Sequence, residues 1–192
     1  MTLAFGLQSV SGERFITVEQ AQKLCFPAAD RFEARIFKFT PEQTKSIQSM
    51  SRQRVLNKGN RAWLAWQGTN LAGVLVLDHV PGKHEVIEYA VAVSPQGAAQ
   101  RVEILEYRES HGGEIRNAKW REQFAGKTTG SKLRLNDDIY NISGATISCR
   151  NVTDGVRRVL ATFSVVVQPV LGVAGADAGV RRVPDQPAHR DR

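Results

Sequence analysis

The chain has 192 residues, of which 42% are hydrophobic and 23% are charged, and its formal net charge is +7. These values are typical of one soluble globular domain with a core and tails. Two cysteines are too few for a disulfide framework, and no stretch reaches transmembrane length. No nucleic-acid-binding motif accompanies the basic charge. The sequence therefore argues against a disulfide-rich protein, a membrane-spanning protein and a nucleic-acid-binding protein.

The N-terminal part of the chain predicts two capped helices with a strand between them. Residues 17–20 (Thr-Val-Glu-Gln) form a capping-box pattern, which starts a helix that ends at residue 24 or 25. Residues 32–39 alternate partly and predict a strand. Residues 40–43 (Thr-Pro-Glu-Gln) start a second helix, with proline at its first position, that ends between residues 52 and 57.

Four strand patterns at hairpin-like spacing fill the middle of the chain. They cover residues 62–67, 71–80, 85–93 and 100–107, and turn residues separate them. The patterns predict an α+β fold, in which an antiparallel sheet of about four to six strands is covered by helices.

After these strands the pattern changes to that of loops and helices. Residues 108–114 are a polar loop with two glycines, and residues 115–124 predict a helix that ends at Gly126. Two leucines within residues 133–135 predict a short edge strand. Apolar residues at helical spacing predict a last long helix from residue 146 to about residue 167, which ends before a proline.

Three segments follow from this organisation. Residues 1–16 contain an apolar run and are expected to be a leader or the remnant of a signal segment. Residues 17–170 form the folded domain. Residues 171–192 are rich in Gly, Ala, Asp, Pro and Arg, and we expect a disordered basic tail there.

The segment Ser143-Gly144-Ala145-Thr146 lies directly before the last helix. A helix N-terminus presents unpaired N–H groups and the positive end of the dipole, which together favour a phosphate. Gly144 and Ala145 leave the backbone accessible, and Thr146 supplies a hydroxyl. The segment therefore predicts a phosphate site, with the phosphate free or attached to Thr146, although a threonine here is also a common helix cap.

The same segment resembles the flavinylation motif of FMN-binding domains. These domains occur in the flavin-carrying subunits of sodium-translocating NADH:quinone reductase and Rnf complexes, and in small secreted flavoproteins. In that family a flavin transferase joins FMN through a phosphoester to the last threonine of the motif, which matches Thr146. The family usually has Asp three residues before the serine, where this chain has Tyr140.

Residues before the motif are similar to the same family, and the similarity covers roughly residues 62–167. The family has a glycine-rich loop that begins near a Glu, then a short helix with Trp and Phe, and then Gly-Lys. The matching residues here, in the same order, are Glu109, Ser110, His111, Gly112, Gly113, Trp120, Phe124, Gly126 and Lys127.

The resemblance implies that residues 17–170 are an FMN-binding domain with FMN covalently attached to Thr146. It implies that the backbone N–H groups of Ile147, Ser148 and Cys149, with Arg150, hold the phosphate. The other residues that it implies around the flavin are Ser143, Gly144, Ala145, Glu109, Ser110, His111, Gly112, Gly113 and Trp120, with Tyr107 as an alternative to Trp120 over a ring face.

The implied role is that of an electron carrier rather than a stand-alone enzyme. Its implied partners are a flavin transferase for maturation and a redox partner such as a membrane reductase or a cytochrome. The implied location is periplasmic or membrane-associated.

Two other functions fit the same residues. One is a non-redox module that holds an anion at the same helix N-terminus, and the other is an accessory protein of a membrane reductase that docks through its basic tail. Among the remaining polar residues, Cys25 and Cys149 are expected to be packing thiols, and Arg157 and Arg158 to lie on the solvated face of the last helix.

Overall fold

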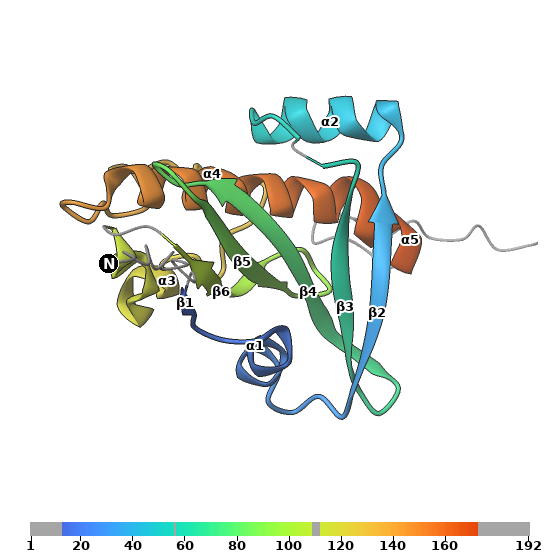
Figure 1. Cartoon of the computed structure of the whole chain (residues 1–192). Helices are drawn as coiled ribbons and strands as arrows, with labels where there is room; N and C mark the ends of the chain where they lie inside the picture. The colour runs from blue at the N-terminus through green and yellow to red at the C-terminus, as the bar shows by residue number, and fades with distance from the viewer. Residues whose placement is uncertain (1–12, 56, 109–111, 173–192) are drawn as a thin grey trace, which may run out of the picture.

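A computed structural model describes residues 13–55, 57–108 and 112–172. Six strands form one antiparallel sheet in the order β1-β6-β5-β4-β3-β2 (Figure 1). The strands are β1 (Glu13–Arg14), β2 (Arg31–Lys38), β3 (Gly59–Gln67), β4 (Asn70–Pro81), β5 (Val86–Val93) and β6 (Ala99–Tyr107). The predicted α+β class is confirmed. β1 lies within the segment expected to be a leader.

Helices cover both faces of the sheet. α2 (Pro41–Ser51) and α4 (Thr146–Thr162) lie on one face, and α1 (Val18–Cys25) lies on the other (Figure 1). Both predicted capping boxes are confirmed. At α2, for example, the Gln43 N–H donates to the Thr40 hydroxyl at 3.1 Å and the Thr40 N–H donates to the Gln43 side chain at 2.9 Å.

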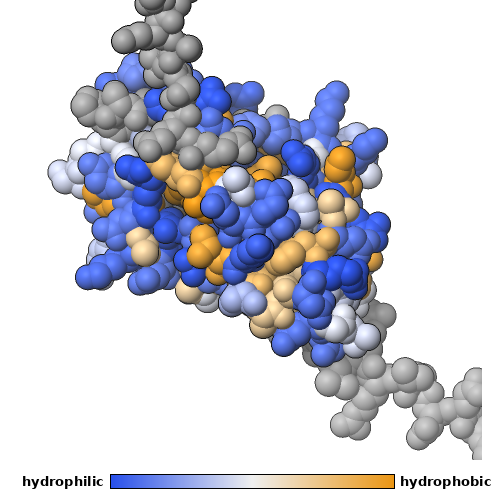
Figure 2. Space-filling model, turned by 60° about the horizontal axis from the view of Figure 1, so that its bottom comes forward, coloured by the Kyte–Doolittle hydropathy of each residue, from blue (hydrophilic) through white to orange (hydrophobic). Residues whose placement is uncertain are grey.

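The main core lies between the sheet and the α2 and α4 face. Tyr89, Ile47 and Phe163 are fully buried there, together with the apolar stripe of α4. A smaller core lies under α1 and includes Phe26 and Leu75. Figure 2 turns the lower side of the molecule forward and shows hydrophobic surface between hydrophilic side chains, as expected where one short helix covers a broad sheet.

The helix predicted at residues 115–124 is two shorter pieces instead. η1 (Gly113–Arg116) is a 3₁₀ helix, and α3 (Ala118–Glu122) follows it. Asn117 breaks the helix, because its ψ of 125° is extended and its side chain caps the Lys119 N–H at 2.9 Å. An asparagine that caps a new helix stops the old one.

The edge strand predicted at residues 133–135 is wrong. Leu133 has a φ of 44°, which turns the chain where a strand would extend it. The side chain of Leu133 is fully buried, so the apolar signal came from core packing rather than from strand alternation. The only ladder contact here within the described residues is a single bridge between Leu135 and Ile139.

The last helix continues beyond its predicted end. α4 passes into a π-helical turn, η2 (Phe163–Val167), and then into α5 (Gln168–Leu171). Pro169 lies in the first turn of α5, where a missing N–H is tolerated. The expected stop before Pro169 is therefore wrong, because the π turn changes the hydrogen-bond register just before the proline.

Arg158 does not lie on a solvated face; that prediction is also wrong. Its guanidinium donates to the Asp78 carboxylate at 2.7 Å and to the His79 carbonyl at 3.0 Å. The Tyr89 hydroxyl donates to the same carboxylate at 2.8 Å, and burial, with the nearby Asp78 charge, raises the pKa of Tyr89 well above its usual value. This buried network ties the middle of α4 to β4 and β5.

Candidate functional site

A tight turn delivers the chain into α4. The Ala145 N–H donates to the Ile142 carbonyl at 3.0 Å, and Gly144 has a φ of 86°, a conformation that favours glycine. A Cβ added at Gly144 would meet nothing within 4 Å, so the outer side of this turn is open. Ser143 and Gly144 are exposed, whereas Ala145 is buried.

Thr146 is the first residue of α4 and not its cap. The capping position belongs to Ala145, which offers no side-chain hydrogen bond. The first helical bond recorded at this end runs from the Cys149 N–H to the Ala145 carbonyl at 2.9 Å. The N–H groups of Thr146, Ile147 and Ser148 therefore precede the ladder, while that of Cys149, expected to hold a phosphate, is already used by the helix.

Asn141 positions the Thr146 hydroxyl, a role that the sequence did not indicate. Its side-chain N–H donates to Oγ1 of Thr146 at 2.9 Å. Its own Oδ1 is buried, with no hydrogen-bond partner among the described residues. Buried acceptors of this kind are uncommon, and they often mark the place of a ligand or a water molecule.

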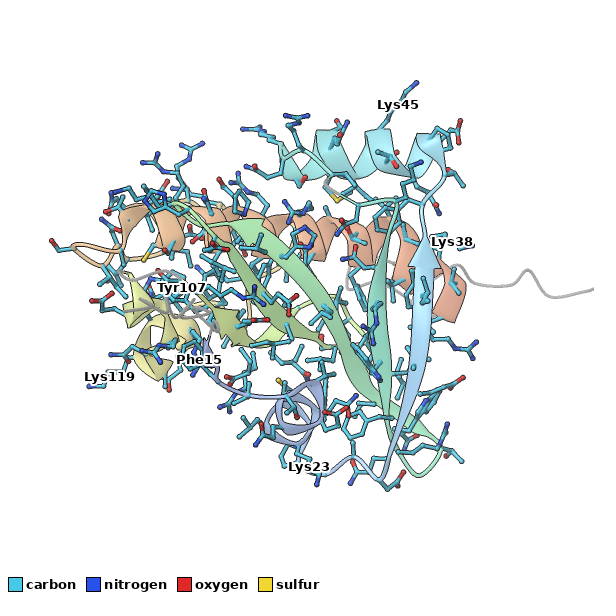
Figure 3. All side chains as sticks on the ribbon, viewed as in Figure 1. Phe15, Lys23, Lys38, Lys45, Tyr107 and Lys119 are labelled. Carbon is cyan, nitrogen blue, oxygen red and sulfur yellow. The ribbon has the colours of Figure 1, made fainter. Side chains whose placement is uncertain are left out.

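Gly112 brings the glycine loop against the motif. Its φ is 87°, and a Cβ there would lie 2.6 Å from the Tyr107 hydroxyl, 3.0 Å from the Ser148 hydroxyl and 3.6 Å from Cα of Ala145. The Tyr107 and Ser148 hydroxyls are themselves 3.1 Å apart, and Figure 3 labels Tyr107 at the end of the sheet near the start of α4. Only glycine fits this approach.

The structure describes only part of the rest of the loop that is expected near the flavin. Glu109, Ser110 and His111 lie outside the described residues. Gly113 opens η1, and its carbonyl accepts from the Arg116 side chain at 3.0 Å.

Two aromatic residues expected to cover a flavin face are core residues. Tyr107 and Trp120 are each only 4% exposed. The Trp120 ring packs edge-on against Phe124, and its N–H donates to the Tyr140 carbonyl at 2.8 Å. In this arrangement neither ring presents a face to solvent.

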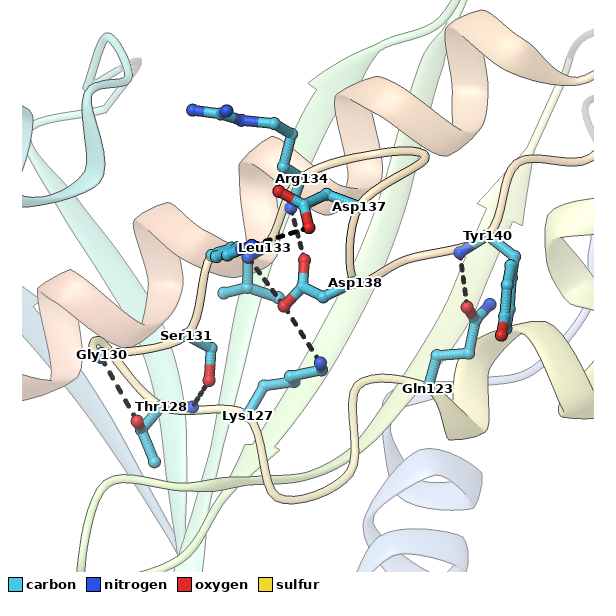
Figure 4. A network of polar contacts seen from close by, with 11 residues as sticks. Gln123, Lys127, Thr128, Gly130, Ser131, Leu133, Arg134, Asp137, Asp138 and Tyr140 are labelled. Atoms are coloured by element: carbon cyan, nitrogen blue, oxygen red, sulfur yellow. Dashed lines mark hydrogen bonds and ion pairs between the residues drawn. The ribbon is translucent and has the colours of Figure 1, made fainter.

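Tyr140 is the exposed aromatic side chain beside the motif. Its side chain is 79% exposed, yet its backbone is held on both sides. Its N–H donates to Gln123 at 2.6 Å (Figure 4), and its carbonyl accepts the Trp120 bond. Since Asn141 follows directly and binds Thr146, the Tyr140 ring projects from a fixed point close to the hydroxyl.

The two thiols are packing residues. Cys149 is fully buried, and burial raises the pKa of its thiol. Cys25 is half-buried, and burial followed by the charge of Glu103 raises its pKa to about 12. Neither thiol is activated as a nucleophile at neutral pH.

Comparisons with known proteins identify the region that contains this site. The FMN-binding domain family matches residues 82–161, which include β5, β6, the glycine loop, the motif and most of α4. The resemblance noted in the sequence is therefore confirmed for this part of the chain. No curated protein matches the chain.

Among solved structures, the chain is similar to Shewanella oneidensis NqrC, with a TM-score of 0.59 and 16% identity over 81% of this chain and 98% of that one. This similarity is one of fold. Within the described residues, none of the helices is long and apolar enough to cross a membrane.

Proposed function

Since residues 82–161 match an FMN-binding domain, we propose that the chain is an electron-transfer flavoprotein that carries FMN on Thr146 through a phosphoester. The observation that carries the proposal is the start of α4. It combines an exposed turn, a positioned hydroxyl and helix N–H groups without a side-chain cap. These features are the ones that an attached phosphate needs.

The residues present fit an attached phosphate group. A phosphodiester on Thr146 keeps one negative charge, which the positive end of the α4 dipole and the N–H groups of Ile147 and Ser148 stabilise. Arg150 lies one turn further along the helix and adds a positive charge. Asn141 donates to Oγ1 of Thr146 and so orients the hydroxyl that would carry the phosphate.

The flavin ring would lie over the exposed surface around Thr146. Tyr140 and Ile147, which are 79% and 48% exposed, offer an aromatic ring and an apolar side chain there. Gly112 keeps the loop backbone close to the helix start. FMN supplies the one- and two-electron chemistry when bound, and the chain binds it, orients it and sets its exposure to partners.

This function requires other proteins. A flavin transferase would attach the FMN, and a membrane reductase or a cytochrome would exchange electrons with it, in a periplasmic or membrane-associated location. The family match and the shared fold with NqrC support this assignment. In the same proposal the flavin-carrying domain spans residues 17–170, with a leader before it and a basic tail after it.

Fluorescence after denaturing electrophoresis tests the proposal. The chain is co-expressed with a flavin transferase, and its band should retain flavin fluorescence, because a phosphoester survives unfolding. Thr146→Val keeps the side-chain shape and should remove the signal, whereas Ser143→Ala should keep it. A band that stays dark, or colourless protein that binds phosphate reversibly, would favour the non-redox anion-binding module.

A further inference from the structure

A basic pocket lies along α4, next to the residues proposed to carry the flavin, and it shares Arg150 with them. It is a pocket of about 290 Å³ between α4 and the loop that precedes the motif, and it is called the arginine pocket below. Its lining comprises Arg134, Leu135, Asn136, Arg150, Thr153, Asp154 and Arg157.

The α4 residues of the arginine pocket share one face of the helix with Thr146. Positions 150, 153, 154 and 157 follow residue 146 at intervals of three and four, which places them in one stripe. At about 1.5 Å rise per residue, Arg150 and Arg157 lie about 6 and 16 Å along the axis from Thr146. The pocket therefore starts about one turn beyond the phosphate position and extends away from it along α4.

The loop that closes the pocket is rigidly built. The Asp138 carboxylate accepts from the Arg134 N–H at 2.8 Å, the Leu133 N–H at 3.1 Å and the Lys127 ammonium at 3.0 Å. Burial alone would raise the pKa of Asp138, but these hydrogen bonds lower it below its usual value. Figure 4 shows this network, with the Arg134 side chain pointing away from it.

Two residues of this loop adopt a conformation that favours glycine. Leu133 has a φ of 44° and Asn136 has a φ of 65°. A leucine rarely adopts this region, and such residues concentrate at ligand sites. The strained backbone and the Asp138 network together hold Arg134 over the same stretch of α4 as Arg150 and Arg157.

The charges in the pocket are not balanced. Arg134, Arg150 and Arg157 contribute three positive charges, and Asp154, which pairs with Arg157, contributes one negative charge, so three minus one leaves two. The Nε of Arg157 is also buried, with no hydrogen-bond partner among the described residues. This Nε has almost no accessible surface, so the net positive charge of the lining is what favours an anion in the pocket.

We propose that the arginine pocket binds a phosphate-bearing small molecule with at least two negative charges. Guanidinium groups match phosphate oxygens with paired hydrogen bonds, and three arginines, one from the loop and two from α4, line this pocket. The concave volume suits a small ligand, whereas a stable protein interface needs a far larger surface.

Isothermal titration calorimetry with inorganic pyrophosphate and ADP tests this site. The measurements use the Thr146→Val chain, which has no hydroxyl for an attached flavin, so the outcome is independent of the proposed function. The test variant is Arg134→Gln with Arg150→Gln. The control is Arg31→Gln with Arg35→Gln, which removes the same charge from exposed side chains on β2. Thermal unfolding checks that both variants stay folded.

The expected result is saturable binding that weakens at least about tenfold in the pocket variant and stays unchanged in the control. Tighter binding of ADP than of pyrophosphate would identify a nucleotide as the source of the phosphates. Tighter binding of pyrophosphate than of ADP would identify a free polyphosphate. The proposal is overturned by absent binding at millimolar ligand or by equal losses in both variants. It is also overturned if a polyglutamate peptide binds more tightly than either probe.

Discussion

The middle and the start of α4 are stabilised in opposite ways. In the middle, Arg158 is buried against Asp78, and Gly155 lies directly against Tyr89. At the start, the capping position is an alanine without a side-chain hydrogen bond, and Thr146 is only partly covered. A helix fixed to the sheet at its centre does not need a capped end, so the N–H groups of its first turn remain available to water or a ligand.

The largest loss of stability is expected when the buried ion pair of Arg158 and Asp78 is broken. Arg158→Met leaves the Asp78 carboxylate buried without its guanidinium, and we expect a loss of about 3–5 kcal/mol in the free energy of unfolding. Urea denaturation measures it. Arg150→Met, about two turns from Arg158 on the same helix but exposed, should change stability by less than about 0.5 kcal/mol. Equal losses of stability in the two variants would show that α4 is not held more tightly at its middle than at its start.

A smaller loss is expected from Gly155→Ala. The added Cβ would overlap the Tyr89 hydroxyl and lie 2.9 Å from Val80, which forces α4 away from the sheet. Overpacking of this kind costs about 1–3 kcal/mol. Adding Tyr89→Phe removes the overlapping hydroxyl and should recover part of the loss in urea denaturation. A Gly155→Ala chain as stable as the wild type would contradict the close contact.

Replacing the threonine at the start of α2 and at the start of α4 should change the free energy of unfolding by different amounts. Thr40→Ala removes the capping-box acceptor of α2 and should cost about 1 kcal/mol. Thr146→Val removes no cap but removes the acceptor of the Asn141 bond, and it should cost about 0.5 kcal/mol in the protein without flavin. Chemical denaturation of both variants makes the comparison, and a larger loss at Thr146 would show that its hydroxyl has a structural role.

The smallest effect on stability is expected at Tyr140. Its side chain is 79% exposed, so Tyr140→Ala should change the free energy of unfolding by less than about 0.5 kcal/mol. If the ring stacks on the flavin, the same change should raise the fluorescence of the native flavoprotein, while Tyr140→Phe should preserve the quenching. Unaltered fluorescence in Tyr140→Ala, with flavin still attached, would place the ring elsewhere.

Local sequence signals were sufficient for the elements that satisfy their own hydrogen bonds. The capping boxes at Thr17 and Thr40 contain both partners within four residues, so their helices could be predicted with close bounds. The strands β3 to β6 follow from alternation and turn residues. The motif could be predicted because it combines small residues, a hydroxyl and a following helix.

Features that depend on distant partners could not be predicted in this way. Arg158 and Asp78 are eighty positions apart, and nothing near either one indicates the pairing. Leu133 is apolar in a short run, which cannot distinguish a strand from a turn held by Asp138. Asn141 gains its role only because the turn at Gly144 brings Thr146 back to it.

The central claim is that the Thr146 hydroxyl carries FMN. Intact-mass spectrometry of the chain co-expressed with a flavin transferase tests it most directly, followed by mapping of the modified peptide. We predict a mass increase of one FMN less one water on the peptide that contains Thr146, and its loss in Thr146→Val but not in Ser143→Ala. An unmodified chain, or the same increase in Thr146→Val, would contradict the account.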